Sequence, residues 1–206
     1  MKSAKTSKAW IKAHINDNFV RKANHEGYRS RAAYKLQEIA ERDALFVPGM
    51  TVVDLGAAPG SWSQIASEAV GVTGKVFALD ILDMQPLPNV TFIQGDFRET
   101  DVLEQLETAL AGEQVGLVIS DMAPNLTGIR VSDQAHVMYL AELALLFCRE
   151  HLNPGKNFLV KVFQGSDFET FRKSMQDDFS KVVVRKPKAS RDRSKELYLL
   201  GLKKII

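Results

Sequence analysis

The sequence predicts an α/β protein built on a mainly parallel β-sheet with helices on both faces. Short apolar runs alternate along the chain with helical patterns, which is typical of strands joined by helical crossovers. The last two apolar runs, at 180–184 and 196–202, are joined without room for a helix and indicate an antiparallel finish. A chain of 206 residues, 45% apolar and 25% charged, is long enough to bury one sizeable core.

The elements follow from the periodicity of the apolar residues. Residues 30–45 carry apolar side chains at helical spacing, from Ala32 to Ala40, and this predicts a helix that ends before Pro48. Seven strands are predicted at 51–55, 75–79, 90–94, 115–120, 157–163, 180–184 and 196–202, with helices between them at about 61–70, 100–111, 132–152 and 167–178.

One domain is expected to span residues 1–206, with a basic N-terminal extension over about 1–29 before the sheet. The N-terminus has no apolar stretch like that of a signal peptide, and no run approaches the ~18 apolar residues of a membrane span. We therefore expect a soluble, cytoplasmic monomer with no membrane partner.

Cysteine and histidine give no sign of a disulfide or of a metal site. Cys148 is the single cysteine and lies on the apolar face of a predicted helix, which favours a core role over that of a nucleophile. The four histidines, His14, His25, His136 and His151, are scattered without metal-ligand spacing. No metal ion is expected.

The charge is unevenly distributed along the chain. Residues 1–35 carry nine Lys or Arg against two acidic residues, and residues 181–195 carry seven against one. These segments have local charges of +7 and +6, which leaves −11 for the rest of a chain with a net charge of +2. Two basic segments around an acidic body indicate a polyanion-binding protein, because phosphate contacts need clustered Lys and Arg. The alternative, a solvated basic tail, fits residues 1–9 better than residues 181–195, which a strand follows directly.

Polar residues follow the predicted strands at the edge where parallel sheets bind ligands. Asp54 lies near the end of the first strand, Asp80, Asp96 and Asp121 follow the next three strands, and Lys161 lies late in the fifth. Any one acidic residue after a strand is equally well explained as a turn residue or a helix cap. Five polar side chains at one rim instead predict a binding site.

The first strand runs into the turn DLGAAPGSW, which opens a helix. A dinucleotide fingerprint fails here, because Ala58 and Ser61 stand where its second and third glycines belong, and the lysine of a P-loop is missing too. Such a turn suits a nucleoside without phosphates, with the backbone at Gly56 and Gly60 close to the ligand and Asp80 accepting from ribose hydroxyls. S-adenosylmethionine is a ligand of this kind.

The predicted strand NFLVKVF raises a separate question, because its lysine, Lys161, lies among apolar residues. Lysine is among the residues least often fully buried, and an unpaired charge in a core is costly. Lys161 therefore either forms a structural ion pair with Asp121 across adjacent strands or serves in a reaction.

The motifs GYRSRAAYKLQEI, VVDLGAAPGSWSQ, SDMAPNLTG, FLVKVFQG and RSKELYLLGL occur in this order and span nearly the whole chain from about Trp10. Together they resemble the FtsJ-type ribosomal RNA ribose 2′-O-methyltransferases. The resemblance implies the Rossmann-like methyltransferase fold, with seven strands of which the last is antiparallel. It implies S-adenosylmethionine contacts at Gly60, Trp62, Asp80, Asp96 and Asp121, and a catalytic set of Lys35, Asp121, Lys161 and Glu196.

The implied chemistry assigns roles to this set. A sulfonium methyl is already activated, so the enzyme must mainly align the reacting atoms and deal with the hydroxyl proton. Lys161 serves as the base if desolvation and the neighbouring cation Lys35 favour its neutral form, while Asp121 and Glu196 orient the amines. A protonated Lys161 would instead steer the hydroxyl or stabilise negative charge. The residues alone leave both roles open, and they also allow a snorkelling Lys35 and a core Trp62.

The function predicted from these observations is methylation of a ribose 2′-hydroxyl, of a uridine according to the resemblance, in large-subunit ribosomal RNA within the assembled 50S subunit. The basic ends would grip phosphates, and the shape of the target would provide specificity. Two alternatives stay open. One is a non-catalytic RNA-binding or ribosome-assembly factor on the same fold, and the other is a base N-methyltransferase, with which DMAPN shares a loose acidic-proline motif.

Overall fold

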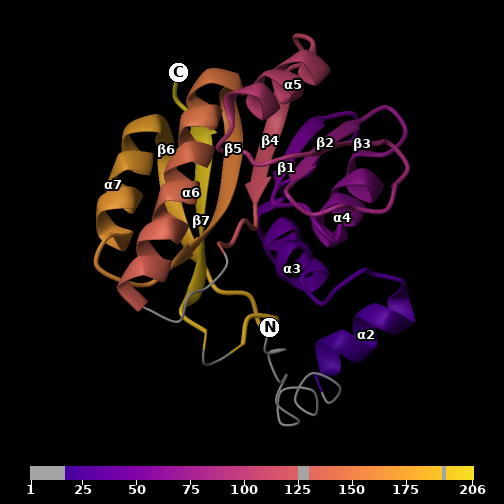
Figure 1. Cartoon of the computed structure of the whole chain (residues 1–206), viewed down its shortest axis with the longest axis horizontal. Helices are drawn as coiled ribbons and strands as arrows, with labels where there is room; N and C mark the ends of the chain where they lie inside the picture. The colour runs from indigo at the N-terminus through magenta and orange to yellow at the C-terminus, as the bar shows by residue number, and fades with distance from the viewer. Residues whose placement is uncertain (1–16, 125–129, 192–193) are drawn as a thin grey trace, which may run out of the picture.

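In the computed structural model, which describes residues 17–124, 130–191 and 194–206, seven strands form one sheet (Figure 1). The strands are β1 (Thr51–Leu55), β2 (Lys75–Asp80), β3 (Val90–Gln94), β4 (Val115–Ser120), β5 (Leu152–Phe163), β6 (Phe179–Arg185) and β7 (Glu196–Lys204). Their order is β3-β2-β1-β4-β5-β7-β6, and β7 is antiparallel to both of its neighbours while the other pairs are parallel. The predicted fold class is confirmed.

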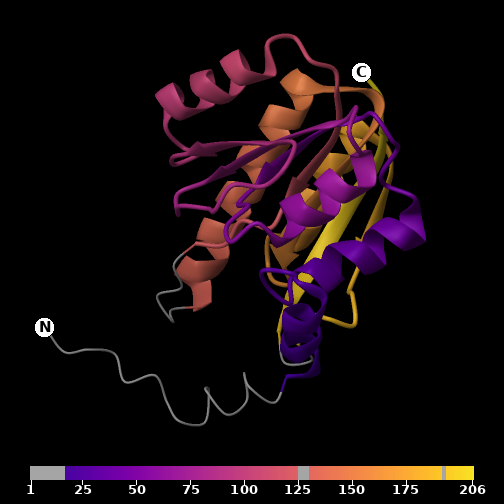
Figure 2. The ribbon, with the colours of Figure 1, turned by 90° about the vertical axis from the view of Figure 1, so that its right-hand side faces the viewer.

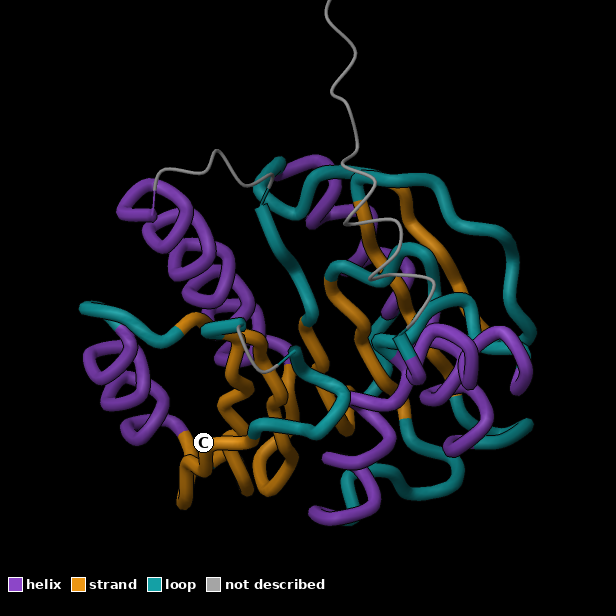
Figure 3. The backbone as a smooth tube through the Cα atoms, turned by 90° about the horizontal axis from the view of Figure 1, so that it is seen from below, coloured by secondary structure: helices purple, strands orange, loops and turns teal. Residues whose placement is uncertain are grey.

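Helices cover both faces of this sheet (Figures 2 and 3). They are α2 (Asn18–Glu26), α3 (Ala33–Asp43), α4 (Ser61–Val70), α5 (Thr100–Leu110), α6 (Arg130–His151) and α7 (Phe168–Asp178). Because successive strand residues point to opposite faces, Val52 and Leu159 pack with α3 and α4, whereas their neighbours Val53 and Val160 pack with α5, α6 and α7. No helix in the described ranges is long and apolar enough to cross a membrane.

The predicted element boundaries agree with the structure to within a few residues, with two exceptions. Strand β5 begins at Leu152 rather than at residue 157, because its pairing with β4 shifts register between Val115 and Leu117. Residues 153–156 (NPGK) are not apolar, so the apolar pattern gave no sign of this earlier pairing.

Helix α2 is the second exception, because the sequence predicted only a basic extension over about 1–29. Asp17 caps this helix by accepting a hydrogen bond from the Phe19 backbone N–H at 3.0 Å, and Gly27 ends it in the left-handed conformation. Only three of its nine residues, Phe19, Val20 and Ala23, are apolar, and this short pattern was too weak to predict a helix. Residues 1–16 of the predicted extension lie outside the described residues.

The described parts of the two basic segments contact each other in the fold (Figure 1). Arg31 forms an ion pair with Asp17, directly before α2, and also donates to the backbone carbonyl of Ala189. Asp43, at the end of α3, binds the guanidinium of Arg185 at 2.6 Å. Residues 17–43 and 185–191 are therefore neighbours in space.

Gly201 in β7 allows the Phe179 ring, at the start of the neighbouring strand β6, to approach the backbone more closely than a side chain there would permit. A Cβ atom at Gly201 would lie 2.6 Å from Cγ of the Phe179 ring, whereas a Cβ at Gly116 in β4 would meet only the Met50 side chain, with the nearest atom, its terminal Cε, at 3.0 Å. We expect Gly201→Ala to lower the free energy of unfolding by about 1–3 kcal/mol. Gly116→Ala is the matched control and should cost clearly less. Equal losses in urea titrations of the two variants would contradict this packing argument.

Candidate active site

The candidate site lies where the strand order reverses, between β1 and β4. In open α/β sheets, ligands bind at this point, beside the carboxyl ends of the strands. The turn after β1 begins here, and Asp121, directly after β4, donates its backbone N–H to the Leu55 carbonyl at 3.1 Å. The predicted rim of polar side chains is therefore built around these two strand ends.

Lys161 and Asp121 form the centre of the site. The Nζ atom of Lys161 lies 3.2 Å from Oδ1 of Asp121 and also donates to the Asp121 backbone carbonyl. Lys161 is only 6% exposed, so its amine is stabilised by contacts within the protein rather than by bulk water. The hydroxyl of Tyr198 donates to the same Oδ1 atom at 2.8 Å.

The pairing of β5 with β7 explains how these side chains meet. Lys161 is the direct cross-strand partner of Tyr198, and Phe163 is that of Glu196, so Lys161, Tyr198 and Glu196 share the sheet face covered by α3. From α3, Lys35 places its Nζ atom 2.7 Å from Oε1 of Glu196 and 5.8 Å from the centre of the Tyr198 ring. The structure thus brings together all four residues of the predicted catalytic set.

Charges across the site keep the Asp121 carboxylate ionised. Burial alone would raise the pKa of Asp121, but the positive charges of Lys161 and Lys35 and the Tyr198 hydroxyl outweigh burial and lower it. Burial and the nearby Asp121 carboxylate raise the pKa of Tyr198 well above its usual value. The centre is therefore an ionised Asp121 carboxylate that two lysine side chains and the Tyr198 hydroxyl stabilise.

Tyr198 is a member of this site that the sequence reasoning missed. Its signal was present, because it stands two residues after Glu196 in a strand and must share the face of that side chain. An apolar-looking strand residue is more easily read as core, and Tyr198 is indeed fully buried. Only its hydroxyl reaches the polar centre.

A second group of side chains surrounds the ends of β2 and β3. Asp80 accepts hydrogen bonds from the backbone N–H groups of Ala58 at 2.9 Å and Leu82 at 2.8 Å. The side chains of Ile81 and Leu82, which follow Asp80 in the chain, are 55% and 62% exposed. The carboxylate therefore lies next to an exposed aliphatic surface. A carboxylate next to exposed aliphatic side chains fits a nucleoside, whose hydroxyls need acceptors and whose base needs an apolar contact.

Asp96 lies at the end of this group and is held by Arg98. The guanidinium donates to both carboxylate oxygens, at 2.9 Å and 2.5 Å, and the Arg98 backbone N–H adds a third contact at 3.0 Å. These hydrogen bonds outweigh burial and lower the pKa of Asp96. The Asp96 carboxylate is therefore ionised and fixed in position before a ligand donates a hydrogen bond to it.

The turn after β1 is held from outside by Arg29. Its two terminal nitrogens donate to the carbonyls of Pro59 and Pro86, both at 2.9 Å, and so join the turn to the loop that follows β2. Gly60 in this turn has a φ of +106°, and a Cβ there would lie 2.5 Å from the Arg29 guanidinium. A glycine is therefore required at this position.

Trp62 occupies a place different from the one expected of a ligand-facing side chain. It is 2% exposed, packs against Tyr198 with ring centres 5.6 Å apart, and donates to the Ala32 carbonyl at 2.9 Å. The indole is thus part of the core between α3 and α4. The group of Trp62 that can still bind a ligand is its backbone N–H, which lies in the first turn of α4.

Asp54 is fully buried behind the turn. Its Oδ2 atom accepts from the Ser63 hydroxyl at 2.6 Å, whereas its Oδ1 atom has no hydrogen-bond partner among the described residues. Burial, assisted by the charges of Asp121 and Asp80, raises the pKa of Asp54 to about 7. Asp54 supports the turn from within and is not open to solvent.

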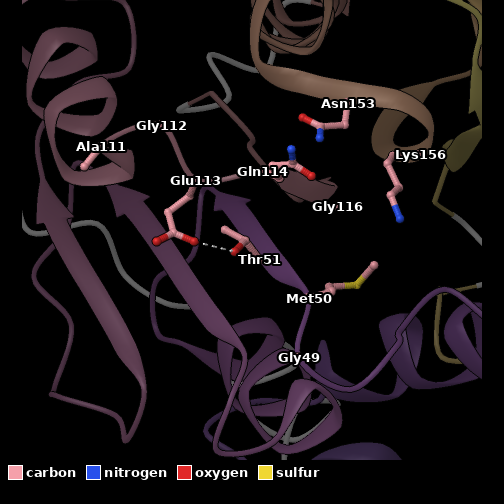
Figure 4. A pocket seen from close by; sticks show the side chains of 10 residues that line it. All are labelled: Gly49, Met50, Thr51, Ala111, Gly112, Glu113, Gln114, Gly116, Asn153 and Lys156. Carbon is pink, nitrogen blue, oxygen red and sulfur yellow. Dashed lines mark hydrogen bonds between the residues drawn. The ribbon is translucent and has the colours of Figure 1, made fainter.

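A hollow of about 440 Å³ lies at the opposite ends of the strands, where β1 and β4 begin (Figure 4). One of its polar groups, the Glu113 carboxylate, accepts from Lys75 at 2.5 Å and from Thr51 at 3.3 Å. It contains none of the strand-end carboxylates or buried lysines described above. Size alone therefore does not make it the functional site.

The sheet topology and the polar side chains at the ends of its strands are those of an α/β protein with its binding site at the switch point of the sheet. Within that class, the chain belongs to the FtsJ-like methyltransferase family, whose family model matches residues 28–204.

Relatives of known name are similar over the full length. A Nitrosomonas europaea protein named Ribosomal RNA large subunit methyltransferase E is 84% identical over 206 residues, which is 100% of both chains. A protein of the same name from an Azoarcus species is 63% identical over 202 residues, 98% of each chain. A solved structure from Plasmodium falciparum, described as a ribosomal RNA methyltransferase, superposes with a TM-score of 0.78 at 29% identity and covers 86% of this chain and 99% of its own.

The raised pKa of Asp54 has a measurable consequence for stability. The folded state keeps a proton that the unfolded chain loses near pH 4, so the free energy of unfolding should fall as the pH rises from about 4 to 7 and then level off. The difference attributable to Asp54 is on the order of 4 kcal/mol as an upper bound. Asp54→Asn cannot ionise and should show a shallower decline in urea titrations across this range. Parallel pH profiles for the two proteins would contradict the buried, protonated carboxyl.

Proposed function

We propose that this protein transfers the methyl group of S-adenosylmethionine to a ribose 2′-hydroxyl in large-subunit ribosomal RNA. The observation that carries the proposal is the buried Lys161 bound to Asp121 at the switch point of a family methyltransferase sheet. The relatives named as large-subunit ribosomal RNA methyltransferases support the substrate. That the nucleoside is a uridine, that the target is the assembled 50S subunit and that the enzyme is a monomer belong to the same proposal.

The chain's own residues suit the proposed cofactor. Asp80 would accept from the ribose hydroxyls, and Asp96 from the base, with Ile81 and Leu82 as the apolar surface. Gly60 and the backbone N–H of Trp62 would line the methionine end of the pocket. When bound, S-adenosylmethionine supplies a methyl group on a positively charged sulfur, which needs no further activation.

Lys161 would act on the proton of the ribose hydroxyl. Its side chain is 6% exposed, which limits hydration of the amine, and Asp121 fixes the position of the amine through both the side chain and the backbone carbonyl. Lys35, whose Nζ atom lies 2.7 Å from Glu196, places a second lysine on the same face of the sheet. Tyr198 would keep Asp121 in place by donating to it.

The adjoining basic segments would hold the RNA. Residues 17–43 and 185–191 meet through Arg31, Asp43 and Arg185, and α3 in the first of these ranges carries Lys35, the partner of Glu196 at the site. Lysine and arginine side chains on this region would contact phosphates, which position an RNA without reading its sequence. Recognition would then depend on the shape of the assembled substrate, so assembled subunits should be methylated faster than protein-free RNA.

The proposed reaction is tested with labelled cofactor and large ribosomal subunits that lack the modification. Label should appear in the RNA, and nuclease digestion should release it as a 2′-O-methyl nucleoside. Label on a base would instead indicate an N-methyltransferase. A protein that binds subunits but transfers no label would be a non-catalytic assembly factor.

Lys161→Ala should reduce methyl transfer by about 10²–10⁴-fold, the range expected for loss of a general base, while the affinity for cofactor stays within a few-fold. Lys156→Ala, at the exposed start of the same strand, is the control and should retain full activity. Lys161→Arg should be as inactive as the alanine variant, because guanidinium keeps its proton. An active arginine variant would make Lys161 a steering cation and remove the base assignment.

Asp80→Ala should weaken S-adenosylmethionine binding in calorimetry. Loss of hydrogen bonds to a charged group, about 1.5–3 kcal/mol, corresponds to roughly 10- to 100-fold in the dissociation constant. Asp83→Ala removes an exposed carboxylate from the same loop and serves as the control. If the two variants bound the cofactor equally well, the ribose contact would have to lie elsewhere.

A further inference from the structure

A groove of about 380 Å³ runs between α3 and α4, on the face of the sheet that also carries Lys35. Its floor is apolar and includes Ala40, Phe46 and Ile65, and Tyr28 lies at its wall. The two helices contribute one carboxylate each, Glu41 from α3 and Glu68 from α4. The groove therefore combines an apolar base with negative charge from both sides.

These two carboxylates are available to a partner. Both Glu41 and Glu68 are exposed, and neither forms a hydrogen bond or an ion pair with another described residue. The acidic residues nearby are engaged, since Glu38 accepts from the Lys188 backbone N–H and Asp43 binds Arg185. The two groove carboxylates thus differ from their neighbours.

The negative charge converges on the aromatic wall of the groove. Burial raises the pKa of Tyr28, and the carboxylates of Glu68, Glu26 and Glu41 raise it further. Of these three, only Glu26 is engaged, by Lys22 at 3.7 Å and by the Tyr34 hydroxyl at 2.8 Å. Two carboxylates that are unpaired among the described residues, Glu41 and Glu68, line the groove together with Tyr28, and this arrangement suits a cationic ligand better than an RNA phosphate.

A lysine or arginine side chain matches the groove in each of its parts. Its methylene stem would lie on the apolar floor, its charged end would reach Glu41 or Glu68, and the Tyr28 ring would offer a cation–π contact. On α3, Glu41 follows Lys35 by six residues, which is about 9 Å along the helix and about 120° around it. A ligand in the groove would therefore lie beside the substrate and not in the catalytic centre.

We propose that this groove binds a lysine- or arginine-bearing protein segment of the assembled large subunit. The proposal rests on the proposed function, because it assumes that the substrate is a ribonucleoprotein particle. It gives the enzyme two surfaces of opposite charge, a basic one for RNA and an acidic one for a protein beside that RNA.

Charge reversal distinguishes a protein ligand from RNA by the sign of the effect. Glu41→Lys/Glu68→Lys should raise the KM for assembled large subunits at least about fivefold, because two attractive contacts become repulsive. The same variant should bind protein-free ribosomal RNA as tightly as the original protein or more tightly, as measured by filter retention. Its S-adenosylmethionine affinity in calorimetry should be unchanged.

Glu104→Lys/Glu142→Lys is the matched control. It makes the same change in net charge at two exposed positions of α5 and α6, on the other face of the sheet. Its KM for assembled subunits should not rise. Glu41→Gln/Glu68→Gln, which only neutralises the groove, should give an intermediate increase.

The other outcomes overturn the inference. A lower KM for subunits in the charge-reversed groove variant would make RNA the ligand, and an unchanged KM would leave the groove without a role. Equal weakening toward subunits and protein-free RNA would point to a contact within this chain. If the original protein methylates subunits and the groove variants match it, the groove proposal alone fails. If the original protein transfers no methyl group to subunits, the proposed function fails as well.

Discussion

The structure of the site depends on the ion pair between Lys161 and Asp121. A nearly buried ammonium is stable only if its partner and its hydrogen bonds replace water, and here the side chain and the backbone carbonyl of one residue do so together. This requires the end of β4 to lie beside the late part of β5, which fixes the centre of the sheet. The hydrogen bond from Tyr198 and the charge of Lys35 also stabilise the ionised form of Asp121. The Lys161–Asp121 pair therefore requires a particular strand order, a particular strand register and a particular set of neighbouring charges.

A second set of contacts ties the N-terminal segment to this centre. Arg29 joins the turn after β1 to the loop after β2, and the Ser30 hydroxyl lies 2.7 Å from that of Ser61. The indole of Trp62 donates to Ala32 from the other side. The segment that precedes the family sheet is therefore built into the wall of the proposed cofactor pocket. It also carries α3, and with it Lys35 and the acidic groove.

Much of this arrangement could be predicted from the sequence, because the sheet follows from local patterns. Alternating apolar runs located the strands, and the rule that ligands bind at carboxyl ends brought Asp80, Asp121 and Lys161 to one rim. The pattern could not reveal α2, which buries a single residue, or the early start of β5, which depends on a register shift with β4. The residues alone allowed a core Trp62, as observed, but they could not assign the Tyr198 hydroxyl to Asp121, because that contact joins two distant elements.

The position of β7 has a consequence for how the site is assembled during folding. This strand follows β6 in the sequence, yet it lies between β5 and β6 and carries Glu196 and Tyr198. Strands β5 and β6 therefore cannot pair with each other first, and each must leave its edge open until β7 inserts between them. Before that step, Asp121 lacks the Tyr198 hydroxyl and Lys35 lacks the Glu196 carboxylate. The polar centre is thus completed in the same step that closes the sheet.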